Sequence, residues 1–96
     1  KAVSMDARVG KEAIGLINGE EDLYDLMKRE SIKYVSIDQN MSSLLRKDPY
    51  IKLLSENNNL NVGDTIKVNS ANFVKVFEKS DSDETYKMYG NIFMVL

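Results

Sequence analysis

The chain has 96 residues, of which 43% are hydrophobic and 29% are charged, and its formal net charge is −2. This length and composition are typical of one globular domain, which we expect to span residues 1–96 and to fold independently. The sequence contains no cysteine and no histidine, which excludes disulfides, thiolate nucleophiles, histidine general bases and the usual zinc ligands.

Two helices are predicted near the start of the chain. Residues 7–18 carry apolar side chains at helical spacing. This helix is expected to end at Asn18-Gly19, because glycine accepts the left-handed conformation that follows a last helical turn. A second helix is predicted from Glu20, with acidic residues in its first turn and basic residues in its last, as the helix dipole favours. Its apolar stripe is predicted to be Leu23, Leu26 and Met27.

A short strand and two further helices are predicted next. Residues 32–37 are rich in β-branched side chains that alternate with polar ones, which indicates a strand. A short helix is expected around residues 41–45. The clearest local signal is Asp48-Pro49, because aspartate accepts hydrogen bonds from the first free amides of a helix and proline tolerates its first position. That helix is predicted to extend to Glu56, with an inward side of Tyr50, Leu53 and Leu54.

After a polar connector the sequence becomes β-prone. Strands are predicted at residues 65–69, 73–79 and 85–96, with a polar tip at 80–84 and a bulge or bend at Gly90-Asn91. The aliphatic side of these strands is expected to consist of Ile66, Val68, Val74 and Val76. The predicted fold class is therefore α+β. A helical N-terminal half, with three to four short helices and one early strand, packs on a C-terminal antiparallel β-meander.

The two acidic clusters do not match a metal or catalytic motif. Residues 81–84 carry three carboxylates, but an EF-hand loop would need glycine and glutamate where Tyr86 and Ile92 stand. Residues 20–25 carry four carboxylates at a helix start, where the helix dipole explains them. We therefore predict no catalytic residue, no metal ligand and no cofactor, and we expect a solvated hairpin tip and an ordinary helix start.

The C-terminal strands carry the surface that we expect to bind a partner. Side chains on a strand alternate between its faces, so Phe73, Lys75 and Phe77 are predicted to share one face. Lys87 and Tyr89 share a face of the last strand, and together these residues would interleave aromatic rings with lysines. Such a face anchors a protein partner or stacks nucleic-acid bases. The alternative is that the two phenylalanines are core residues beneath a helix.

Three functions follow from these patterns. The first is a non-catalytic interaction or regulatory module that binds another protein. The second is a nucleic-acid-binding domain, because the order of elements is analogous to a winged helix, with Asp48–Glu56 as recognition helix and residues 80–84 as wing. The acidic wing counts against this second function. The third is an enzyme that uses carboxylate, lysine or tyrosine chemistry.

No apolar run is long enough to span a membrane, since the longest is at residues 92–96. The chain is expected to be soluble, and either cytoplasmic or secreted after processing.

Overall fold

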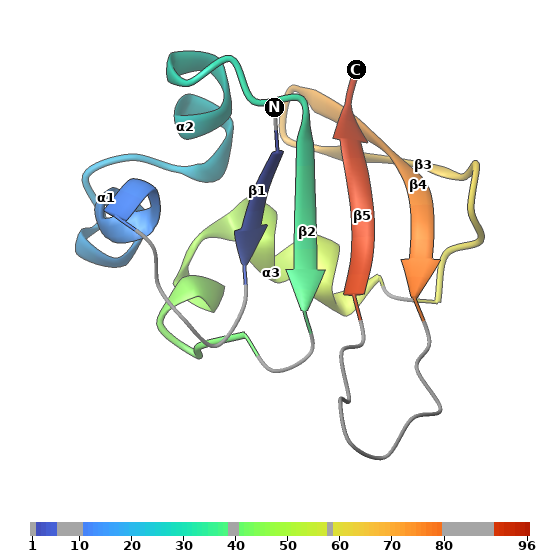
Figure 1. The fold of residues 1–96 in the computed structure, drawn as a ribbon, viewed down its shortest axis with the longest axis horizontal. Helices are drawn as coiled ribbons and strands as arrows, with labels where there is room; N and C mark the ends of the chain where they lie inside the picture. The colour runs from blue at the N-terminus through green and yellow to red at the C-terminus, as the bar shows by residue number, and fades with distance from the viewer. Residues whose placement is uncertain (1, 6–10, 39–40, 58, 80–89) are drawn as a thin grey trace.

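The computed structural model describes residues 2–5, 11–38, 41–57, 59–79 and 90–96, and in this part of the chain it shows an α+β fold (Figure 1). The helices are α1 (Ile14–Asn18), α2 (Leu23–Arg29) and α3 (Pro49–Glu56), with the short 3-10 helices η1 (Lys11–Ala13) and η2 (Leu45–Lys47). The strands are β1 (Ala2–Met5), β2 (Tyr34–Asp38), β3 (Thr65–Val68), β4 (Ala71–Lys79) and β5 (Gly90–Val95). The predicted fold class is confirmed, with helices in the N-terminal half and most strands in the C-terminal half.

The five strands form one mixed sheet in the order β1-β2-β5-β4-β3. β1 and β2 are parallel, and the other neighbouring pairs are antiparallel. The last strand, β5, lies between β2 and β4, so the early strand and the C-terminal meander belong to one sheet (Figure 1). β1 was not predicted from the sequence. Its four residues alternate between exposed and buried positions, but so short an alternation is a weak strand signal.

The helices cover one face of this sheet. In Figure 1 α3 passes behind the strands, and α1 and α2 lie toward the β1 edge. The sheet contributes Val3, Met5, Val35, Ile37, Val68, Ala71, Phe73 and Phe93 to a single core. The helices contribute Ala13, Leu16, Leu23, Leu26, Met27, Leu45, Tyr50, Ile51 and Leu54. No described helix lies over the opposite face of the strands in Figure 1.

The helices differ from the predictions mainly at their ends. The predicted helix at 7–18 is described only from residue 11, where η1 leads into α1, and it ends at Gly19 with φ 73°, as predicted. The apolar stripe of α2 is buried as predicted. The helix expected around 41–45 is replaced by η2, which begins at Leu45. In α3 the inward residue is Ile51 rather than Leu53, which is 38% exposed.

Asp48 joins α2 to α3. Its carboxylate accepts hydrogen bonds from the backbone amides of Tyr50 and Ile51, both at 3.0 Å, which confirms the predicted helix cap. It also accepts a hydrogen bond at 2.9 Å from the amide of Leu23, the first residue of α2. The side chain is only 5% exposed. One buried carboxylate therefore binds the N-termini of two helices that are distant in the sequence.

Burial raises the pKa of the Asp48 carboxyl above its ordinary value of 3.8, while the backbone amides that it binds act in the opposite direction. When the pKa of an acid is raised by folding, its contribution to stability is fully present below the unfolded pKa. That contribution is lost as the pH rises through the folded pKa. We therefore expect the free energy of unfolding of the wild type, relative to an Asp48→Asn variant, to be highest in acid and to fall from about pH 4 upward. Urea unfolding of both proteins across this range measures the difference, and a difference that grows with pH would contradict the prediction.

Candidate functional site

The structure does not place the predicted site residues on one face, because β4 contains a bulge. Lys75 lies opposite Phe93 of β5 and Phe77 lies opposite Ile92, so Val76 is one extra residue without a counterpart. An extra residue reverses the alternation of side chains along the strand. Phe73 and Lys75, before the bulge, therefore point to the opposite face of the sheet from Phe77, after it.

Phe73 and Lys75 are interior residues, each with 0% exposure. The ring of Phe73 lies 6.3 Å from that of Tyr50, between the sheet and α3. The Nζ of Lys75 donates a hydrogen bond to the carbonyl of Leu60 at 2.6 Å and lies 3.4 Å from the carboxylate of Glu78. The expectation that these two side chains face a partner is thus corrected. Phe73 is a core residue, and Lys75 fixes the loop before β3 against β4.

A bulge or bend was predicted at Gly90-Asn91, and the structure has no bulge between these two residues. Gly90 and Asn91 continue the pairing with both neighbouring strands in unbroken register, because the extra residue lies on β4 instead. Lys87 and Tyr89 lie outside the described residues, as does the predicted tip at 80–84. Phe77 is the predicted site residue that the structure describes as exposed, at 50%.

The helix-free face of the sheet carries an apolar surface, termed here the outer patch. Tyr34, Met94 and Val74 form a row across β2, β5 and β4, and Ile92 and Phe77 pair in the adjacent row. Tyr34 is 36% exposed and Phe77 is the most exposed of the five, while the other three are partly buried. A contiguous apolar surface of this kind commonly marks an interaction site.

Sequence reasoning missed four of the five residues in the outer patch. A signal was present in β5, where Phe93 is buried in the core and its neighbours Ile92 and Met94 are apolar as well. A strand that is apolar on both faces has either a second covering layer or an exposed apolar face. The sequence does not distinguish these cases, and Tyr34 and Val74 carry no comparable signal by themselves.

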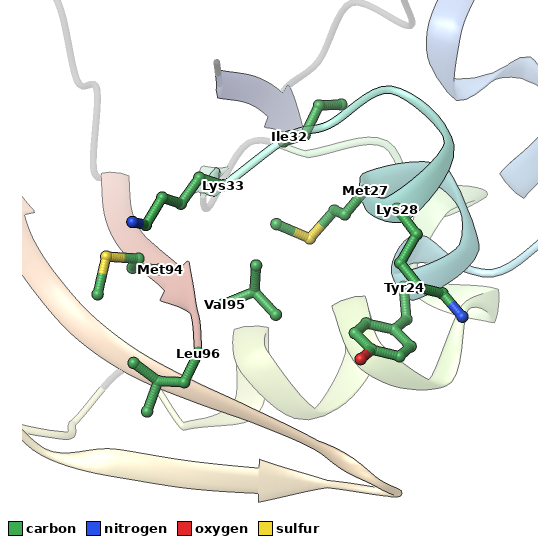
Figure 2. A pocket seen from close by; sticks show the side chains of 8 residues that line it. All are labelled: Tyr24, Met27, Lys28, Ile32, Lys33, Met94, Val95 and Leu96. Atoms are coloured by element: carbon green, nitrogen blue, oxygen red, sulfur yellow. The ribbon is translucent and has the colours of Figure 1, made fainter.

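A hollow of about 420 Å³ lies beside the outer patch, between α2 and the end of β5 (Figure 2). Met94 belongs to both the hollow and the outer patch. The Nζ of Lys28 lies 4.5 Å from the centre of the Tyr24 ring. The residues that line the hollow are Tyr24, Met27, Lys28, Ile32, Lys33, Met94, Val95 and Leu96, and none of them is acidic.

The acidic residues at the start of α2 stabilise this helix. Asp22 caps the helix by accepting a hydrogen bond from the amide of Asp25, at 2.8 Å. Glu21 pairs with Arg29 at the other end of the helix, at 2.7 Å. Within the described residues, no group of three or more acidic side chains is arranged to hold a metal ion. Over the same residues, no helix is long and apolar enough to cross a membrane.

Comparison with known proteins gives no significant similarity: no family model matches the chain, and no curated protein or solved structure matches it. The geometry of the outer patch and its neighbouring hollow is therefore the basis for a functional proposal.

Proposed function

We propose that this domain is a non-catalytic module that binds another protein through its outer patch. The observation that carries the proposal is the helix-free face of the sheet, where five apolar side chains lie in two adjacent rows on three neighbouring strands. Removing such surface from water stabilises a complex by roughly 25 cal/mol per Å² of apolar area. Aromatic residues such as Tyr34 and Phe77 dominate the binding energy of many protein interfaces.

The composition of the outer patch favours a protein partner over a nucleic acid. Its centre is formed by Val74, Ile92 and Met94, which offer no flat ring on which a base could stack. Lys75, the lysine that would have met a phosphate, is buried in the core. The chain carries a net charge of −2, whereas nucleic-acid-binding domains are usually basic. We therefore expect a partner that presents an apolar surface of its own.

A double variant, Phe77→Thr with Ile92→Thr, is expected to keep the fold and to weaken partner binding by at least about tenfold. Threonine retains β propensity while it removes most of the apolar surface of one row. A photo-crosslinking residue at position 77 captures the partner, and titration calorimetry with that purified partner measures the affinity. Circular dichroism checks that the double variant remains folded.

The matched control is Leu53→Thr, which removes an exposed apolar side chain from α3 rather than from the outer patch. This control is expected to bind the partner as the wild type does. Equal affinity for the double variant and the wild type would overturn the proposal, as would capture of nucleic acid alone at position 77. If sedimentation shows a wild-type dimer and a monomeric double variant, the partner is a second copy of the chain.

A further inference from the structure

We propose that the hollow between α2 and the end of β5 receives an apolar side chain flanked by carboxylates, on an acidic segment of the partner protein. This inference rests on the proposed function and adds the chemistry of the partner to it. Three features of the hollow support it: its apolar floor, its two exposed lysines and its place beside the outer patch.

The floor of the hollow is built from apolar side chains. Figure 2 shows Met27 and Val95 pointing into it, with Ile32 on the side of β1. Met27 and Ile32 are also buried members of the core, so the floor is held in place from below. Methionine adapts to side chains of different shapes, because it is unbranched and flexible. The floor is thus suited to accept one apolar side chain.

The charged side chains that line the hollow are two lysines, Lys28 and Lys33. Lys28 and Lys33 are both exposed, and no acidic residue lines the hollow. Lys28 has an exposed partner in Asp25, but at 3.7 Å this ion pair contributes little. Lys33 makes no ion pair within the part of the chain that the structure describes. Two further hollows on the described surface are lined by acidic side chains, whereas this one is not.

The hollow adjoins the outer patch at Met94, which lines the hollow although its side chain lies on the other side of β5 from that of Val95 (Figure 2). The hollow is also open to solvent, whereas pockets for small molecules usually enclose most of the ligand. Two backbone amides beside the hollow already have acceptors, since Val95 donates to the carbonyl of Lys33 and Leu96 donates to that of Asn72. Recognition here therefore depends on side chains, and a partner that covers the outer patch can extend a segment into the hollow.

The probes are three short capped peptides: Glu-Leu-Leu-Glu, Lys-Leu-Leu-Lys and Glu-Ser-Ser-Glu, each acetylated and amidated. They are titrated into the ¹⁵N-labelled full chain, and amide chemical shifts are followed by NMR. The acidic apolar peptide is expected to shift the amides of Met27, Ile32 and Val95, and the other two peptides are expected to bind at least several-fold more weakly. Equal effects from the acidic and basic apolar peptides, or shifts confined to other regions, would overturn the inference.

Variants separate this inference from the proposed function. Lys28→Gln and Lys33→Gln are each expected to lower the affinity for the acidic apolar peptide by roughly threefold, because each removes one exposed ion pair. Lys52→Gln, at an exposed position of α3, is the matched control and should have no effect. The Phe77→Thr and Ile92→Thr variant should still bind the peptide. If that variant loses the partner while the lysine variants retain both partner and peptide, the hollow plays no part and the proposed function stands.

Discussion

Replacement of Asp48 by alanine is expected to lower the free energy of unfolding by about 2–4 kcal/mol. The carboxylate accepts three backbone hydrogen bonds at 2.9 to 3.0 Å, two from the start of α3 and one from the start of α2. Alanine would leave these three donors without their acceptor at a buried position, where water replaces it poorly. Chemical unfolding followed by circular dichroism measures the loss.

Asp22→Ala is the matched control, because it also removes the aspartate cap of a helix. Its carboxylate is exposed and accepts one hydrogen bond, from the amide of Asp25. We expect this variant to lose only about 0.5–1 kcal/mol, since water can reach the freed amide. Equal losses for the two variants would show that the bond from Asp48 to α2 and its burial add nothing to an ordinary helix cap.

The features that the sequence predicts well depend on residues close together in the chain. The aspartate-proline pair at Asp48-Pro49 specifies the start of α3, and Gly19 specifies the end of α1. The helical spacing of the apolar residues in α2 specifies the side that is buried. The physical causes are a helix cap, a residue in the left-handed conformation and a helical period. Each of them acts within a few residues of the chain.

The features that the sequence does not predict depend on contacts between residues that are distant in the chain. The second role of Asp48, the bond to Leu23, spans 25 positions of the sequence. The place of β5 between β2 and β4 is likewise a property of the whole sheet. Local patterns carry no information on which strands become neighbours. The sequence therefore predicts a separate meander where the structure has one sheet.

The residues of β4 that face the core are not the ones predicted, and this difference has a specific cause. Val74 and Val76 were expected on the aliphatic side, because both are aliphatic and alternation places them on one face of the strand. The pairing of Phe73 with Ile66 of β3 instead places Phe73, and with it Lys75, on the core side. Lys75 tolerates this position because its ammonium group finds the Leu60 carbonyl and Glu78. The bulge then returns Phe77 to the outer face, which is why only part of the predicted site is exposed.

Because Lys75 is a core residue, its replacement is the second change that we expect to cause a large loss of stability. Lys75→Ala is expected to lower the free energy of unfolding by about 2–4 kcal/mol, because it removes a fully buried aliphatic stem beside Phe93 and leaves a cavity. Lys75→Met keeps most of this stem and removes only the ammonium group. Urea unfolding of both variants against the wild type separates packing from charge.

We expect the free energy of unfolding of the Lys75→Met variant to be only about 1 kcal/mol below that of the wild type. Loss of one partner from a buried ion pair is costly when the other charge is left buried, but the side chain of Glu78 is half-exposed and can be solvated by water. The hydrogen bond to Leu60 is partly buried, so its loss accounts for the remaining cost. If Lys75→Met is as unstable as Lys75→Ala, the ammonium group rather than the stem stabilises this part of the core, and the bond to the loop before β3 is its main contribution.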